Sequence, residues 1–169
     1  MRRCGLLDGS HTVSKRKRFP KACLAIDCSN HMILACVPSR GPGGDHILLP
    51  KLLPRLARNF SVKTLVADAG FDTEKSLQMI RHQFQIEPLI PPLRSVNNRT
   101  VPQGTERRRM FYAFQNGTPI QYKQRWQVET VMSMVKRNIA HALRARSFHS
   151  QNKEIFLLAL THNIAIARY

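Results

Sequence analysis

The sequence predicts an α/β domain in which a mixed sheet is flanked by helices. Short apolar runs of strand length alternate along the chain with longer segments of helical periodicity, the pattern of a layered α/β architecture. The 169 residues are enough for one domain with a core, and the 43% hydrophobic content is too high for a disordered chain. We therefore expect residues 1–169 to form a single domain.

The first half of the chain is predicted to form a hairpin followed by alternating helices and strands. The run ACLAIDC and the run MILACV have strand character, and the short polar stretch between them predicts a tight turn. Asp45 and Asp72 each precede a helical pattern and are expected to cap it. The expected elements, in order, are strands at residues 22–28 and 32–37, a helix at 46–59, a strand at 63–68, a helix at 73–84 and a strand at 87–91.

The second half of the chain is expected to be a loop and two helices. Residues 92–121 are rich in Pro, Asn and Arg, with RRR at residues 107–109, and predict a basic insertion loop. Helical periodicity then extends over residues 122–145 and again over residues 151–166. No internal repeat is visible.

The charge of the chain points to nucleic acid as the partner. Lys and Arg total 27 against 10 acidic residues, which gives a formal net charge of +17 spread from Arg2 to Arg168. An excess of this size on a globular core favours a polyanion. No run approaches the roughly 18 apolar residues of a membrane span, and no signal peptide is visible. We therefore expect a cytoplasmic DNA-binding protein without a membrane partner.

One helix is expected to carry a polar stripe along the edge of its buried face. At about 100° per residue, Tyr122, Arg125, Glu129 and Lys136 fall within a stripe about 60° wide. A neighbouring stripe has the ordinary apolar pattern of a packed face and contains Val128, Met132, Val135 and Ile139. The simpler interpretation is a surface ion pair of Arg125 with Glu129, worth about 0.3–0.5 kcal/mol. Spacing alone does not decide between this pair and a functional site.

A second acid strengthens the functional interpretation. Asp68 ends the apolar run KTLVAD, and the carboxyl ends of strands are where open α/β sheets place their chemistry. Alone it is best explained as a turn aspartate. Together with Glu129, in a very basic chain, it is typical of a phosphoryl-transfer site that binds two Mg²⁺ or Mn²⁺ ions about 3.5–4 Å apart.

These residues carry a resemblance to a known family. The spacing Y-x2-R-x3-E-x6-K from Tyr122 to Lys136, with the blocks SRGPGGDH, LVADAGFDTE, RWQVETVMSMVKR and LTHNIAIAR, resembles the DDE transposases of bacterial insertion sequences, in the insertion-sequence 4 group. The similarity covers nearly the whole chain from about Phe19 onward.

The resemblance implies an RNase H-like fold and metal-dependent cleavage and strand transfer at insertion-sequence ends. Asp68 and Glu129 are then expected to be catalytic and to bind Mg²⁺ or Mn²⁺, two ions in all. Arg125 and Lys136 are expected to contact DNA phosphates, and Tyr122 to position the DNA. The implied partners are transposon ends and target DNA, bound by a homodimer at the bacterial nucleoid.

The first aspartate of the family pattern has no clear counterpart. Asp8 follows only two leucines and stands in a turn dipeptide, Asp-Gly, while Asp27 fits a structural role better. We expect that the first strand and its aspartate are missing, that the chain is a C-terminal or truncated piece, and that it is weak or inactive by itself. The alternatives are a non-catalytic basic DNA-binding remnant and an RNase H-like nuclease or resolvase.

Overall fold

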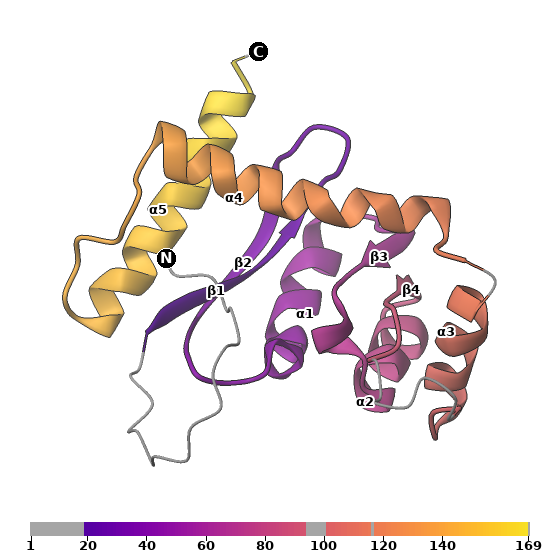
Figure 1. Cartoon of the computed structure of the whole chain (residues 1–169). Coiled ribbons are helices and arrows are strands. Elements are labelled where there is room, and N and C mark those ends of the chain that lie inside the picture. The colour runs from indigo at the N-terminus through magenta and orange to yellow at the C-terminus, as the bar shows by residue number, and fades with distance from the viewer. Residues whose placement is uncertain (1–18, 94–100, 116, 169) are drawn as a thin grey trace.

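A computed structural model describes residues 19–93, 101–115 and 117–168 of the chain (Figure 1). Its strands are β1 Pro20–Ile26, β2 Ile33–Arg40, β3 Thr64–Val66 and β4 Glu87–Leu89. Its α-helices are α1 Leu49–Asn59, α2 Glu74–Gln78, α3 Thr105–Gln115, α4 Gln127–Asn138 and α5 Phe148–Ile166. Four shorter turns of helix are η1 Asp45–Leu48, η2 Ala69–Phe71, η3 Met79–Gln83 and η4 Ile120–Trp126, of which η3 is π-helical and the others 3₁₀.

β1 and β2 form the predicted antiparallel hairpin. The ladder runs from Pro20 paired with Arg40 to Ile26 paired with Ile33. In the turn, one carboxylate oxygen of Asp27 accepts hydrogen bonds from the backbone N–H and the hydroxyl of Ser29, at 2.8 and 2.7 Å. Asp27 is therefore a structural turn residue, one residue beyond the strand in which the sequence analysis placed it.

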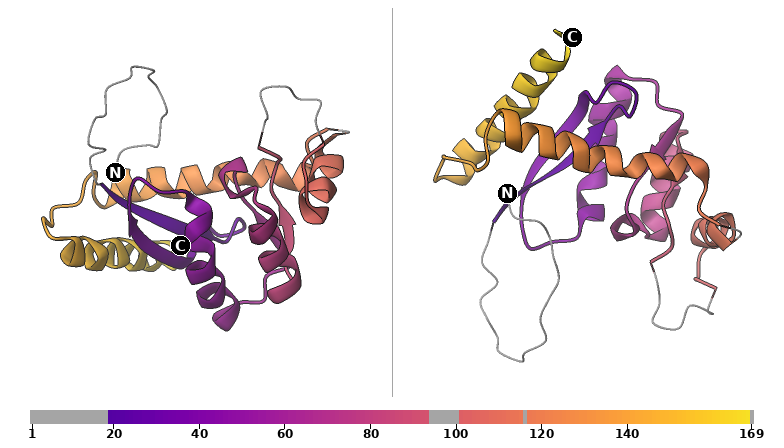
Figure 2. Two further views of the ribbon diagram at one scale, coloured as in Figure 1. Left: turned by 90° about the horizontal axis from the view of Figure 1, so that it is seen from below. Right: turned by 45° about the horizontal axis from the view of Figure 1, so that its top comes forward.

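The hairpin is covered on both faces (Figures 1 and 2). One face packs on α1 in the larger apolar cluster, which extends to α2 and in which Leu53 and Leu77 are fully buried. The other face packs with α4 and α5 in a smaller cluster around Val131, Val135 and Ile155. The result is a layered α/β arrangement in which the hairpin lies between helices.

The strands make two small sheets in place of the expected single mixed sheet. β3 and β4 are parallel and pair from Thr64 with Glu87 to Val66 with Leu89. Within the described residues, β1 pairs only with β2 and β3 only with β4. Antiparallel and parallel pairing are both present, as the prediction of a mixed sheet requires, but no described strand connects the two pairs.

Both predicted helix caps are wrong. Asp45 makes no cap hydrogen bond and lies 2.5 Å from the ammonium of Lys21, while a 3₁₀ turn precedes α1. Thr73, and not Asp72, caps α2, because its hydroxyl accepts the N–H of Ser76 at 3.1 Å. Each aspartate instead pairs with a basic side chain that is distant along the chain, and such a contact cannot be predicted from local sequence.

The predicted loop over residues 92–121 contains a helix, α3, held by ionic contacts. Both carboxylate oxygens of Asp72 accept hydrogen bonds from the guanidinium of Arg107, at 3.1 and 2.9 Å. Glu106 is buried and accepts a bond of 2.7 Å from Arg81. The carboxylate of Glu74 accepts the N–H groups of Glu106 and Arg107, at 3.1 and 3.0 Å, and so caps the helix from another segment.

The predicted helix over residues 122–145 has different ends and two geometries. It starts as the 3₁₀ turn η4 and continues as α4, which ends at Asn138. The last predicted helix is present as α5, whose first turn is capped by the hydroxyl of Ser147. None of the helices in the described part of the chain is both long and apolar enough to cross a lipid bilayer.

Candidate active site

Asp68 lies just beyond the carboxyl end of β3, where the chain turns into η2. It is exposed, and its Oδ1 accepts the N–H of Ala69 at 2.7 Å, so it also caps this 3₁₀ turn. The capping bond uses one lone pair of Oδ1, and no described residue hydrogen-bonds Oδ2. The position therefore combines a structural contact with an oxygen that can accept a ligand.

Tyr122, Arg125 and Glu129 come from η4 and the first turn of α4. Residues three apart eclipse one another in a 3₁₀ helix, so Tyr122 and Arg125 share a face of η4. Arg125 then donates to Glu129 Oε1 at 3.1 Å across the junction of the two helices. The ion pair that the sequence suggested as the simpler interpretation is thus formed, with side chains 36% and 65% exposed.

Asp68, Arg125 and Glu129 line a common cavity of about 270 Å³, which we call the inter-sheet groove. Its walls are β1 on one side and β3 with its following residues on the other. Buried leucines of α1 and Val128 of α4 supply most of the remaining apolar lining. The two carboxylates expected from the sequence therefore belong to one cavity and come from a strand end and a helix.

Tyr122 lies close to this group, although it is not part of the lining. Its ring packs edge-on against Phe114 of α3, with centroids 5.2 Å apart and planes at 85°. Burial raises the pKa of the Tyr122 hydroxyl, while the charge of Arg125 lowers this pKa and the charge of Asp68 raises it. The tyrosine is therefore within electrostatic reach of both charged groups.

Lys136 is the signature residue that the structure keeps apart from the groove. It is half-buried in the last turn of α4, seven residues beyond Glu129, which is about 10 Å along the helix axis. It is not among the residues that line the groove. Its position suits contact with a long ligand that runs along α4.

The donor atoms present suit a hard divalent cation. Asp68 and Glu129 are carboxylates, which Mg²⁺ and Mn²⁺ prefer, and each is exposed enough to accept a ligand. Among the residues that the structure describes, no three His, Cys, Asp or Glu side chains gather as a metal site. Two carboxylates are a small ligand set for two ions. Asp8, which sequence analysis weighed as the first aspartate of the family pattern, lies outside the described residues.

The groove also contains polar residues that sequence analysis did not single out. Gln124 lies in its lining, and its carbonyl oxygen is 3.9 Å from the sulfur of Cys28. Nearby, the side chain of Gln127 hydrogen-bonds the ring of His31 at 2.6 Å. These contacts fix the hairpin turn against η4 and α4. The only signal for them was their position next to Tyr122 and Arg125.

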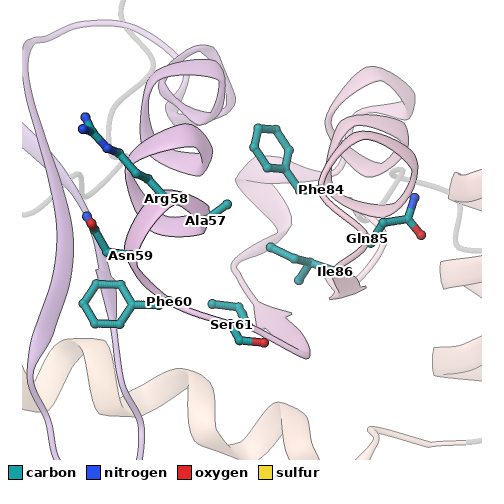
Figure 3. A pocket seen from close by; sticks show the side chains of 9 residues that line it. Ala57, Arg58, Asn59, Phe60, Ser61, Phe84, Gln85 and Ile86 are labelled. Carbon is teal, nitrogen blue, oxygen red and sulfur yellow. The ribbon is translucent and has the colours of Figure 1, made fainter.

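A larger cavity lies elsewhere. It has a volume of about 530 Å³ and is lined by the end of α1, the segment that leads to β3, and residues 84–86 (Figure 3). Arg58 is its only charged lining residue, and the lining contains no carboxylate. Of these two cavities, only the smaller inter-sheet groove has carboxylates in its lining.

A carboxylate at a strand end and another on a helix, beside an arginine in a strongly basic α/β domain, define a candidate site for phosphoryl transfer on nucleic acid. Comparison with protein families gives a match to the transposase DDE domain over residues 2–164. The chain belongs to this family of transposases, which act on DNA and generally depend on a divalent metal. No curated protein and no solved structure gave a significant match.

Proposed function

We propose that the chain carries the catalytic carboxylates of a DNA transposase of the insertion-sequence 4 group. In this proposal it catalyses metal-dependent cleavage and strand transfer at the ends of its own insertion sequence. The observation that supports this most is that Asp68 and Glu129 line one groove, together with Arg125. The Y-R-E-K spacing and the net charge of +17 support DNA as the substrate.

In the proposed mechanism, Asp68 and Glu129 would hold the divalent ions, which would supply activation of the attacking oxygen and stabilisation of the leaving oxygen. Arg125 is partly exposed, and its pair with the exposed Glu129 is weak, worth about 0–1 kcal/mol. It can therefore turn from the carboxylate to a DNA phosphate at small cost. Tyr122, held by Phe114, packs against the DNA, and Lys136 contacts a phosphate further along α4.

The number of ions and the assembly state belong to the same proposal. We propose two Mg²⁺ or Mn²⁺ ions, with a third carboxylate needed to complete their ligands. Transposition joins two element ends to one target, and we propose that a homodimer at the bacterial nucleoid binds them. Light scattering of the protein mixed with end DNA measures this stoichiometry.

The test uses a supercoiled plasmid that contains the gene for this chain with its flanking DNA. We expect at most weak Mn²⁺-dependent nicking of the flanking DNA, because the described site supplies only two carboxylates, and we expect this nicking to be lost in Asp68→Asn and Glu129→Gln. Asp45→Asn is the matched control, because Asp45 is a half-exposed carboxylate that pairs with Lys21 and does not line the groove. Equal nicking by Asp68→Asn and Asp45→Asn would exclude Asp68 from the chemistry.

Two further outcomes identify the alternatives. Salt-sensitive binding of the plasmid without nicking, at any Mn²⁺ concentration, indicates a non-catalytic DNA-binding remnant. Preferred cleavage of a four-way DNA junction over the flanking DNA indicates an RNase H-like nuclease or resolvase. The proposed transposase is supported only by nicks that map to the element ends and by joined products.

A further inference from the structure

The segment η4 has a geometry that is uncommon for its length. Runs of 3₁₀ helix longer than three or four residues are rare, because their hydrogen bonds are poorer than those of an α-helix. η4 nevertheless continues over seven residues, Ile120–Trp126, and passes directly into α4. The sequence of η4 has the same helical periodicity as α4, so contacts from elsewhere in the molecule are needed to favour the 3₁₀ form.

The turn between β1 and β2, which passes beside α4, makes such contacts (Figure 1). The ring Nε2 of His31 donates a hydrogen bond of 2.6 Å to the side-chain oxygen of Gln127, the residue at which α4 begins. The side-chain nitrogen of Gln127 donates in turn to the side chain of Gln124 at 3.4 Å, and the carbonyl of Gln124 lies 3.9 Å from the sulfur of Cys28. These contacts span the junction of η4 with α4, next to Arg125.

The other side of the turn is anchored to α5. His162 is 3% exposed, and its Nε2 donates a hydrogen bond of 3.0 Å to the backbone oxygen of His31. The side-chain amide of Asn163 makes two hydrogen bonds of 2.8 Å, to the backbone N–H and to the carbonyl of Ile33 at the start of β2. The turn is therefore a fixed support against which η4 is held.

The backbone of His31 indicates that its ring has a role of its own. Its φ of 64° lies in the left-handed region, which glycine adopts at lower cost than histidine does. The turn is closed without the ring, by hydrogen bonds of 2.9 Å from the N–H of Asp27 to the carbonyl of Met32 and from the N–H of His31 to the carbonyl of Asp27. A side chain that costs backbone energy and does not close the turn is best explained by its contact with Gln127.

We propose that His31 is a positioning residue that keeps η4 in the 3₁₀ form and so aligns Tyr122 with Arg125. Residues three apart eclipse one another in a 3₁₀ helix, whereas in an α-helix they differ by about 60° around the axis. Their separation along the axis is about 6 Å in a 3₁₀ helix and about 4.5 Å in an α-helix. Loss of the His31 contact would therefore turn the tyrosine away from the face that holds the arginine.

Only the use of this alignment rests on the proposed function. If DNA is the ligand, a 3₁₀ segment offers Tyr122 and Arg125 to one stretch of DNA at the same time, and an α-helical segment does not. The geometry of η4 does not depend on what it binds. It is therefore measured first, and without DNA.

Nuclear magnetic resonance of the whole chain tests the geometry. Because the backbone bonds of the two helices differ in span, the pattern of contacts between α-hydrogens and amide hydrogens distinguishes a 3₁₀ segment from an α-helical one. We expect the 3₁₀ pattern over residues 120–126 in the wild type, and the α-helical pattern in both His31→Asn and His31→Gly. Asparagine and glycine accept the left-handed backbone, so neither variant should lower the unfolding midpoint by opening the turn.

The matched control is His141→Asn, which removes an exposed histidine from the segment that follows α4. It should keep the 3₁₀ pattern. Equal rearrangement in His141→Asn would overturn the proposal, because the loss of any histidine would then have the same effect. A 3₁₀ pattern that persists in both variants of His31 would also overturn it, as would an α-helical pattern in the wild type.

Trp126, the only tryptophan of the chain, provides a second readout. It is the last residue of η4 and is 54% exposed, so its fluorescence reports on the junction with α4. We expect His31→Asn and Gln127→Leu to change its emission by the same amount, and the double variant to show no further change, because one contact is removed in all three. Changes that add in the double variant would mean that the two residues act separately, and would overturn the proposal.

DNA binding is read separately, from the dependence of plasmid affinity on salt. Removing one phosphate contact lowers the magnitude of the salt slope by about 1. We expect this loss for Arg125→Gln and for His31→Asn, and no further loss when the two are combined. A rearranged η4 with an unchanged salt slope leaves the positioning role standing and counts against DNA as the ligand of this face. A lower slope in His31→Asn without any change in η4 overturns the positioning role and leaves DNA binding standing.

Discussion

The contact of Arg107 with Asp72 predicts that this arginine stabilises the fold, whereas a basic residue of a DNA-binding loop would not. Arg107 belongs to a run of three arginines in the segment that the sequence analysis predicted to be a basic loop. In the structure its guanidinium makes two hydrogen bonds to a carboxylate that is fully buried, while the arginine itself is 27% exposed. The pKa of Arg107 is raised, chiefly by the hydrogen bond to Asp72. We therefore expect the change Arg107→Leu to destabilise the fold.

The size of the effect follows from the burial of the partner. Removing one member of a buried ion pair costs about 3–5 kcal/mol, because the remaining charge is left without compensation. A bond of 2.8 Å from the N–H of Leu93 still reaches Asp72, so we expect the lower end of this range. Leucine and arginine have similar helix propensity, so α3 itself is not weakened. With a urea m-value of about 2 kcal/mol/M, the unfolding midpoint should fall by about 1.5 M.

Arg109→Leu is the matched control for this measurement. It removes the same charge from the same helix, at an exposed residue for which the structure shows no acidic partner. Its effect on the midpoint should correspond to about 0.5 kcal/mol or less. Replacing both members, by Arg107→Leu with Asp72→Leu, should recover part of the stability. Equal midpoints for Arg107→Leu and Arg109→Leu would refute the buried ion pair.

Three further predictions concern DNA binding, pH and thiol reactivity. If about six phosphates are neutralised, the logarithm of the DNA association constant should fall with the logarithm of the salt concentration, with a slope near −5. A DNA affinity that does not change with salt would exclude binding through phosphate neutralisation. Burial raises the pKa of Glu74, but hydrogen bonds from the N–H groups of α3 outweigh it and the net pKa is lowered. Its contribution is therefore present above pH about 4.5 and lost as the pH falls through the folded-state pKa. Glu74→Gln should unfold more easily than wild type at pH 7, by about 1 kcal/mol, and a stability gap that does not narrow toward pH 3 would contradict the capping role. Burial raises the pKa of Cys23 to about 12 and that of Cys36 to about 11, so iodoacetamide should modify half-buried Cys28 before either, as mass spectrometry of the native protein can show.

The sequence predicted most elements because their signals are local. Alternation identified the hairpin strands, and helical periodicity identified α1 and α5. The sequence analysis could not predict α3, because the cap of that helix comes from Glu74, 32 residues before Glu106. The sequence analysis also predicted one regular helix where η4 and α4 join, because 3₁₀ and α turns have similar periods. The division into two sheets depends on which edges pair, and this is a long-range property.

The contacts of the acidic residues leave few candidates for the metal-binding carboxylates. The chain has 10 acids, and nine lie in the described residues. Seven of these nine satisfy backbone N–H groups or basic side chains away from the groove, and they are Asp27, Asp45, Asp72, Glu74, Glu87, Glu106 and Glu154.

Only Asp68 and Glu129, of the nine described acids, line the groove, and each is held by a single short-range contact. A chain with a net charge of +17 has enough basic groups to neutralise every carboxylate. Asp68 and Glu129 nevertheless have only exposed contacts at a shared apolar cavity, and their oxygens can therefore accept a cation. If the site needs a third carboxylate, Asp8 is the one acid of the sequence that lies outside the described residues.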